Sequence, residues 1–322
     1  MSKKICVLAS GGDAPGMNAC VESVFHNATA RGYTIYGAIA GYNGLVKDDI
    51  VFLTRDCHPE KKYAVATNIG HLSGCVLNCG RSEEFTTQAG FNKALAVIKK
   101  HRFDALVILG GNGSLNGAER LTKAGIPTIA IPATIDNDVA FTGNSLGFSS
   151  AMEECVRLID NLSATMQTND RDHIVQLMGR YCSDLAVMVG AATFATIVDT
   201  IDARHSPAEV AEIFKLSRSR GRTSNLMVMQ EKKNIDVATE AMETASYLQE
   251  LAQLTGETHV RMTTLGHLQR GAAPSGRDRW LASFYGERAV NSISANQFGV
   301  AIGMVRDYFI SVPIEKVGVS PK

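Results

Sequence analysis

The stretch IPATIDND, residues 131–138, places two acids, Asp136 and Asp138, two positions apart directly after an apolar run that is typical of a strand. On a turn or an extended segment, acids at positions i and i+2 are able to serve different targets, one facing a substrate hydroxyl and the other a metal ion. The alternative is an ordinary turn in which the acids and Asn137 bond their own backbone. We interpret the stretch as the candidate chemical centre because other polar loops also follow apolar runs.

Two glycine-rich loops follow such runs. They are GGDAPG at residues 11–16 and GGNGS at residues 110–114. A glycine-rich turn that leads into a helix presents backbone N–H groups to a phosphate. Neither loop is a P-loop, because the chain contains no Gly-Lys pair, and in the second loop the last glycine comes one residue too late for the dinucleotide fingerprint. Ordinary tight turns remain the alternative for each loop.

Several arginines favour a substrate that carries more than one phosphate. The planar guanidinium group binds phosphate oxygens in pairs. We expect five arginines to follow strand ends, namely Arg81, Arg171, Arg180, Arg261 and Arg270.

Short β-branched runs alternate with amphipathic segments along the chain. This pattern predicts an α/β fold of two doubly wound lobes with mainly parallel sheets. Strands are expected at residues 5–9, 34–40, 50–53, 105–109, 128–131, 173–177, 196–198, 225–229, 260–265, 300–305 and 308–312. Helices are expected at residues 17–31, 91–101, 114–124, 147–166, 183–192, 207–218, 238–254 and 278–293. In such sheets ligands bind beyond the carboxyl ends of the strands, where the motifs fall.

Composition restricts the class of protein. With 322 residues, of which 45% are hydrophobic, the chain is able to bury a large core and is expected to form two lobes. Lys and Arg number 32 and Asp and Glu number 32, so we expect neither a nucleic-acid nor a membrane partner. The N-terminal apolar run is too short for a signal peptide, and the run at residues 185–198 is too short to span a membrane. We therefore expect a cytoplasmic protein.

The cysteines are scattered and number 7, which is typical of reduced thiols. A zinc site is a less favoured alternative, because the spacing matches no compact finger pattern. Its ligands would come from Cys57, His58, His71, Cys75 and Cys79.

From Lys4 to about Val305 the chain resembles a 6-phosphofructokinase of the short bacterial type. The resemblance rests on GGDAPGMN at residues 11–18, TIDND at 134–138, MGR at 178–180 and LGHLQRG at 265–271. It implies the phosphofructokinase fold, with a nucleotide-binding lobe at residues 1–138 and 266–313 and a sugar-phosphate lobe at residues 139–265. It also implies a Mg²⁺-dependent transfer of the γ-phosphoryl group of ATP to the 1-hydroxyl of fructose 6-phosphate in glycolysis.

The resemblance further implies roles for individual residues. Asp136 is expected to be the base, Thr134 to orient it, and Asp138 to assist the site and its metal. Gly11, Arg81 and Arg180 would line the path of the phosphoryl group. The sugar phosphate would be held by Arg171, Met178, Gly179, Arg180, Glu231, Arg261, His267 and Arg270, with Arg171 and Arg261 from a neighbouring subunit of a homotetramer. The nucleotide would be held by Gly11, Arg81, Ser82, Gly111, Asn112, Gly113 and Ser114.

The nucleotide site departs from the family pattern. Asn112 stands where the family has an aspartate at the metal, and Ala133 stands where ATP-using members have glycine and pyrophosphate-using members have lysine. Gly113 matches the ATP type, whereas Ser82 and Thr86 replace an aromatic residue and an arginine. We expect a metal at Asn112 and Asp138 and a weaker use of MgATP. The alternatives are full activity, a catalytically impaired paralogue that binds sugar phosphate as a regulatory subunit, and pyrophosphate as the donor.

The residues expected for the effector pocket also differ from the family pattern. The bacterial family binds anionic effectors there with basic residues, of which this chain keeps Arg55, Arg220 and Arg222. Glu22 and His26 occupy the first helix. Because a carboxylate repels an anion, we expect weak or absent control by ADP and phosphoenolpyruvate.

Overall fold

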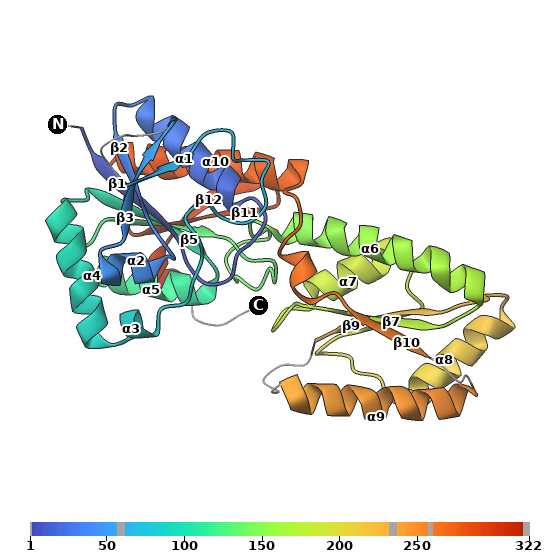
Figure 1. The fold of residues 1–322 in the computed structure, drawn as a ribbon. Coiled ribbons are helices and arrows are strands. Elements are labelled where there is room, and N and C mark those ends of the chain that lie inside the picture. Colours follow the sequence, from blue (N-terminus) through green and yellow to red (C-terminus); the bar gives the residue numbers. More distant parts are fainter. Residues whose placement is uncertain (1, 57–61, 232–236, 257–259, 318–322) are drawn as a thin grey trace. The chain divides into compact units, whose positions relative to one another are not determined.

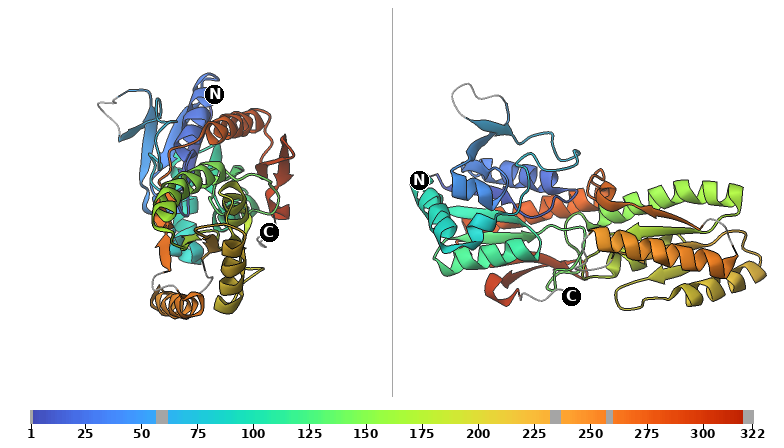
Figure 2. Two further views of the ribbon diagram at one scale, coloured as in Figure 1. Left: turned by 90° about the vertical axis from the view of Figure 1, so that its right-hand side faces the viewer. Right: turned by 60° about the horizontal axis from the view of Figure 1, so that its bottom comes forward.

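The computed structural model describes residues 2–56, 62–231, 237–256 and 260–317 (Figures 1 and 2). The chain divides into two compact units, one made of Met1–Ser150 and Arg270–Lys322 and the other of Ala151–Gln269. The first boundary falls after Ser150 and not after Asp138, because Asn137 holds the following segment. Its side chain donates to the carbonyl of Gly143 at 3.1 Å and accepts from the N–H of Ser145 at 2.9 Å.

The first unit is built on an eight-stranded sheet in the order β12-β11-β6-β5-β1-β2-β3-β4. The pairs β2–β3 and β11–β12 are antiparallel and the others are parallel. The strands are β1 (Lys4–Ala9), β2 (Thr34–Ala38), β3 (Ile50–Thr54), β4 (Tyr63–Val65), β5 (Ala105–Gly110), β6 (Thr128–Pro132), β11 (Val300–Val305) and β12 (Tyr308–Pro313). Strands β5 and β6 are buried at every residue, which explains their continuous apolar sequence.

Helices cover both faces of this sheet (Figure 1). On one face α1 (Met17–Thr29) packs against α10 (Gly276–Ser294). The other face carries α2 (Tyr42–Lys47), α3 (Glu83–Thr86), α4 (Gln88–His101) and α5 (Asn112–Lys123), and the chain continues after β12 into η2 (Ile314–Lys316). The short elements α2, α3 and β4 were not predicted, because three to six residues are too few to show a helical or strand period.

The second unit contains a four-stranded parallel sheet in the order β10-β7-β9-β8. The strands are β7 (His173–Leu177), β8 (Ile197–Asp199), β9 (Leu226–Gln230) and β10 (Arg261–Thr264), and η1 (Gly266–Gln269) follows β10. In Figure 1, α6 (Phe148–Asn169) and α7 (Asp184–Ala192) lie on one face, and α8 (Pro207–Ser219) and α9 (Val237–Thr255) lie side by side on the other. The prediction of two doubly wound, mainly parallel sheets is confirmed. In the part of the chain that the structure describes, no helix is long and apolar enough to cross a membrane.

Asp278 joins the start of α6 to the start of α10 in the first unit. Its fully buried carboxylate accepts hydrogen bonds from the N–H of Gly147 at 2.9 Å and the N–H of Ser150 at 2.7 Å. Burial raises the pKa of Asp278, and these hydrogen bonds oppose the rise. Asp278→Ala leaves buried donors without an acceptor, so we expect the free energy of unfolding to fall by about 2–3 kcal/mol in chemical denaturation.

Asp307→Ala is the matched control for this loss. The Asp307 carboxylate pairs with Arg277 at 2.9 Å but is exposed, and an exposed pair contributes about 0–1 kcal/mol. Equal losses in the two variants would contradict the role given to the buried carboxylate.

Candidate active site

The three polar loops meet at one edge of the first unit's sheet. Strands β5, β1 and β6 end at this edge, with β5 parallel to and between the other two. The Ser114 hydroxyl donates to the carbonyl of Ser10 at 3.0 Å, and the N–H of Ala133 donates to the carbonyl of Gly110 at 3.0 Å. The strand order reverses between β1 and β5, and doubly wound sheets bind ligands at such a switch point.

The acidic turn is almost entirely buried. Thr134, Asp136 and Asp138 are each less than a tenth exposed. The Thr134 hydroxyl accepts from the N–H of Asp136 at 3.2 Å, and Asn137 adopts a left-handed backbone with φ 51°. Asn137, which bonds the segment after the turn, therefore fixes the turn. The interpretation as a hydrogen-bonded turn and the interpretation as a chemical centre are thus compatible. Asn137 fixes the turn, and Asp136 and Asp138 are the candidate chemical groups.

Asn112 connects the second glycine loop to this turn. Its Nδ2 donates to the backbone carbonyl of Asp138 at 3.2 Å. It does not cap α5, because the N-cap residue is Gly111 and no side chain caps that helix. The amide oxygen of Asn112 and the carboxylate of Asp138 are ligands of the kind that Mg²⁺ prefers.

These two side chains alone make a weak cation site. Among the described residues no group of three or more His, Cys, Asp or Glu is arranged to hold a metal ion. The donor set therefore fits an ion that takes most of its ligands from phosphate oxygens and water. Cys57 and His58 of the zinc alternative lie outside the described residues.

Arg270 lies against the first glycine loop. Its Nη1 donates to the carbonyl of Asp13 at 3.0 Å. A Cβ atom at Gly12 would stand 2.4 Å from the same nitrogen, so any other residue at position 12 would require the guanidinium group to shift.

The remaining predicted nucleotide residues are placed as follows. The N–H of Gly11 donates to the carbonyl of Gly80 at 3.1 Å, which places the backbone of Arg81 beside the first loop. The side chain of Arg81 is exposed. Gly113 faces open space, since a Cβ atom there would meet nothing within 4 Å. The Ser82 hydroxyl accepts from the N–H of Phe85 at 3.2 Å and so caps α3, which is a structural role.

In the second unit, the MGR motif meets Glu231. Strands β7 and β9 are adjacent and parallel, and Met178 and Glu231 follow their carboxyl ends. The N–H of Arg180 donates to Oε1 of Glu231 at 3.2 Å, and the N–H of Glu231 donates to the carbonyl of Leu177 at 2.8 Å. Arg180 has φ 52° and its side chain is exposed. Its guanidinium group is therefore accessible to a ligand at this edge.

Two buried glutamines that the sequence analysis missed support this edge. Gln269 accepts from the N–H of Met178 at 3.2 Å and donates to the carbonyl of Gly266 at 2.9 Å, which ties β7 to the turn that carries the exposed His267. Gln230 donates to the carbonyl of Cys182 at 3.1 Å. The only available signals were that Gln269 lies within the LGHLQRG motif and that Gln230 follows a predicted strand end.

The expectation that Arg171 and Arg261 follow the carboxyl ends of strands is wrong, and so is the same expectation for Arg81, which directly precedes the N-cap of α3. Arg171 precedes β7 and Arg261 begins β10, which is parallel to β7, so both lie at the amino ends of strands. They are exposed at the edge of the sheet opposite to Met178 and Glu231. Arg261 is paired with His173 in the register of β10 and β7, and burial and the charge of Arg261 lower the pKa of His173. Within one chain the second unit therefore does not bring these arginines to the MGR motif.

The predicted effector residues are divided between the units. Arg55, Glu22 and His26 belong to the first unit, and Glu22 Oε1 lies 3.4 Å from His26 Nε2. Arg220 and Arg222 belong to the second unit, where Arg222 donates to the Thr196 hydroxyl at 2.9 Å.

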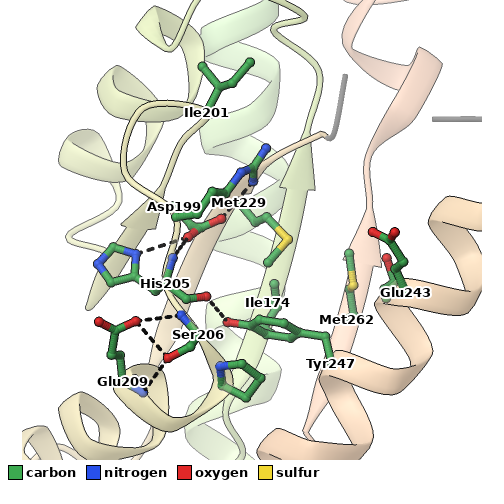
Figure 3. Close-up of a pocket in the computed structure, with 13 residues that line it drawn as sticks. Ile174, Asp199, Ile201, His205, Ser206, Glu209, Met229, Glu243, Tyr247 and Met262 are labelled. Atoms are coloured by element: carbon green, nitrogen blue, oxygen red, sulfur yellow. Dashed lines mark hydrogen bonds and ion pairs between the residues drawn. The ribbon is translucent and has the colours of Figure 1, made fainter. Parts of the chain in front are cut away.

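A cavity of about 710 Å³ lies between the sheet of the second unit and α9 (Figure 3). None of the described residues predicted for the site lines it. Its polar edge is formed by the buried carboxylate of Asp199, which accepts from Arg204 Nη1 at 2.8 Å and from the N–H of His205 at 2.6 Å. Arg204 also donates to the carbonyl of Glu231 at 3.1 Å. The ion pair therefore helps to fix the backbone at Glu231.

Comparisons with known proteins agree with this geometry. A family model described as phosphofructokinase matches residues 4–293. The chain is 35% identical over 317 residues to the ATP-dependent 6-phosphofructokinase of Shouchella clausii, covering 98% of this chain and 93% of the relative. It is 37% identical over 302 residues to the ATP-dependent 6-phosphofructokinase of Listeria welshimeri, covering 94% of this chain and 89% of the relative.

Solved structures share the fold. Phosphofructokinase from Saccharomyces cerevisiae matches with a TM-score of 0.83 and 28% identity, over 98% of this chain and 45% of that one. A pyrophosphate-dependent phosphofructokinase from Marinobacter aquaeolei also reaches a TM-score of 0.83, over 99% of this chain and 85% of that one. At 19% identity this second match shows likeness of fold alone.

Proposed function

This chain is a member of the phosphofructokinase family, and on that premise we propose that it transfers the γ-phosphoryl group of ATP to the 1-hydroxyl of fructose 6-phosphate in glycolysis. Relatives named ATP-dependent 6-phosphofructokinases support ATP as the donor. The observation that carries the proposal is the buried turn at residues 134–138, held beside two glycine loops at the switch point of the sheet.

The proposed step is a direct displacement at phosphorus. The Asp136 carboxylate takes the proton of the 1-hydroxyl as that oxygen bonds to the γ-phosphorus, and the bond from the γ-phosphorus to the β–γ bridging oxygen breaks to release ADP. Thr134 fixes the turn at Asp136 through the 3.2 Å hydrogen bond to its N–H. Asp136 therefore has a defined position for proton removal.

The phosphates of ATP are anionic, so their binding requires positive charge and N–H donors. The loops at Gly11 and at residues 111–114 offer backbone N–H groups, and Arg81 and Arg180 offer guanidinium groups. Mg²⁺, when bound, neutralises charge on the β- and γ-phosphates. We assign it to Asp138 and the amide oxygen of Asn112, which are joined through the 3.2 Å contact of Asn112 with the Asp138 carbonyl.

The sugar phosphate is assigned to the residues that the resemblance implies. We assign the contacts to Met178, Gly179, Arg180, Glu231, His267 and Arg270. Arg171 and Arg261 lie at the opposite edge of the second unit's sheet, and this placement supports a homotetramer in which they reach the site of a neighbouring subunit. We further propose that the enzyme acts in the cytoplasm and responds weakly to ADP and phosphoenolpyruvate.

A comparison of phosphoryl donors tests the function. Purified protein with Mg²⁺ and fructose 6-phosphate is expected to turn over with ATP and not with pyrophosphate, measured as fructose 1,6-bisphosphate formed per second. Turnover with pyrophosphate alone would overturn the donor. Calorimetric binding of fructose 6-phosphate without turnover from either donor would instead show a paralogue that binds sugar phosphate without catalysis.

A further inference from the structure

Three consecutive backbone N–H groups of the first unit bind one carboxylate. Oε1 of Glu22 on α1 accepts from the N–H of Asn68 at 2.6 Å. Oε2 accepts from the N–H of Gly70 at 2.7 Å and of Ile69 at 3.2 Å. Asn68 has a left-handed backbone with φ 58°, and successive N–H groups turned in this way form a concave site for an anion.

The carboxylate fits this site closely. A Cβ atom at Gly70 would stand 2.9 Å from Oε2 of Glu22, so glycine leaves room for the carboxylate in this position. Burial raises the pKa of Glu22, but the hydrogen bonds from the N–H groups of Asn68 and Gly70 and from the ring of His26 together lower it by more. The pKa of Glu22 therefore lies below its usual range. Glu22 is therefore ionised at neutral pH and complements the N–H groups as an anion.

One histidine lies beside this site. Nε2 of His26 lies 3.4 Å from Oε1 of Glu22, and the Thr67 hydroxyl donates to the carbonyl of Arg55 at 3.1 Å, which places the Arg55 backbone beside the loop. A free anion in place of the carboxylate would therefore meet three N–H donors and the ring of His26.

The same face of α1 also binds the segment that follows residues 68–70. Asn18, one helical turn before Glu22, accepts from the N–H of Val76 at 2.6 Å and donates to the carbonyl of Ser73 at 3.2 Å. The segment then reaches Gly80, whose carbonyl accepts from the N–H of Gly11 at 3.1 Å. The segment from residue 68 to residue 80 is thus held by hydrogen bonds at several points between the Glu22 carboxylate and the first glycine loop.

We propose that residues 68–70 form an oxyanion-binding loop that the chain fills with the side-chain carboxylate of Glu22, which acts as a tethered anion. A free carboxylate or phosphate would bind the same N–H groups only after the Glu22 carboxylate is removed. Because a tethered group has a high effective concentration, millimolar free anion does not displace it. The native chain is therefore permanently in the anion-bound arrangement.

A consequence for the donor site rests on the proposed function. The filled loop helps to hold residues 68–80 in place. It therefore also helps to hold the backbone of Arg81, which follows Gly80, beside Gly11. Emptying the loop is expected to raise the KM for ATP, and free phosphate is expected to restore it.

Amide hydrogen exchange tests the loop without any reference to activity. In Glu22→Ala, the N–H groups of residues 68–70 are expected to exchange about 10-fold faster or more than in the native protein, because each loses a charged acceptor. Inorganic phosphate or acetate is expected to restore the protection of these N–H groups in a saturable way and to raise the Tm of this variant by more than that of the native protein, in which the exchange of residues 68–70 is expected to stay unchanged. Unchanged exchange in Glu22→Ala, or exchange that neither anion slows, would overturn the proposal.

Two further variants keep the test decisive. Glu22→Gln retains the shape and one acceptor oxygen, so it is expected to show intermediate exchange and to take up no phosphate; exchange equal to the native rate would show that charge is irrelevant and contradict the proposal. Glu287→Ala removes an exposed carboxylate from α10 and is expected to behave as the native protein. If phosphate slowed the exchange of residues 68–70 in Glu287→Ala, the effect would not depend on an empty loop, and the proposal would be contradicted.

The kinetic arm separates this inference from the proposed function. If no variant phosphorylates fructose 6-phosphate, the proposed function fails while the exchange result still decides the loop. If Glu22→Ala takes up phosphate but its KM for ATP equals the native value, the coupling to the donor site is overturned.

Discussion

Replacement of Asp136 by serine is expected to lower kcat by about 10²–10⁴-fold, which is the usual contribution of a positioned general base. The KM for fructose 6-phosphate is expected to stay within a few-fold of the native value, because the base acts in the transition state and adds little to ground-state binding. Steady-state kinetics at saturating MgATP measure both parameters. The backbone of the turn should survive the change, since Thr134 and Asn137 fix it through bonds that do not use the Asp136 side chain.

The control for this variant is Asp160→Ser, which replaces an exposed acid on α6 and is expected to leave both constants unchanged. The assignment of the base would be contradicted if Asp136→Ser raised the KM steeply at an unchanged kcat. Such a result would mean that Asp136 binds the sugar phosphate and does not take its proton.

Replacement of Asn112 by aspartate is expected to strengthen the use of MgATP by about 10- to 100-fold at limiting Mg²⁺. The carboxylate adds a charged ligand, and a charge-assisted contact contributes roughly 1.5–3 kcal/mol. The variant also loses the hydrogen bond from Asn112 Nδ2 to the Asp138 carbonyl, so we expect the free energy of unfolding to fall by about 1 kcal/mol without the metal. A Mg²⁺ titration of kcat/KM for ATP and a denaturation curve measure the two effects.

Two controls accompany the Asn112 experiment. Mass spectrometry must show that the native Asn112-Gly113 pair has not deamidated, because deamidation itself produces aspartate. Asn112→Ala removes the amide oxygen and the Nδ2 donor together, and it is expected to use MgATP less well than the native protein. If neither variant changed the Mg²⁺ dependence, residue 112 would have no part in metal binding.

The sequence predicted the fold because its signals are local. Runs such as residues 105–109 are apolar at every position, which indicates a strand covered on both faces, and glycine loops mark the carboxyl ends of such strands. The acidic turn and both glycine loops come after adjacent parallel strands, so the first unit brings them to one edge. Local patterns did not place the MGR motif beside Glu231; the resemblance alone implied that the two share a site.

Contacts between residues distant in the sequence were not predictable. Glu22 was expected to repel an effector, but it is bound by N–H groups that lie 46 to 48 positions further along the chain. Neither backbone N–H groups nor the loop that turns them to one point have a sequence signature. The same reason explains why Gln269 and Arg204 were missed, since each acts through a backbone group of another segment.

Transfer of an isotopic label tests the central claim most directly. Purified protein is incubated with Mg²⁺, fructose 6-phosphate and ATP that carries ¹⁸O in its γ-phosphoryl group, and the products are identified by mass spectrometry. We predict that the label appears in the 1-phosphate of fructose 1,6-bisphosphate, together with unlabelled ADP. Label found only in inorganic phosphate, or retained entirely in ATP, would contradict the account.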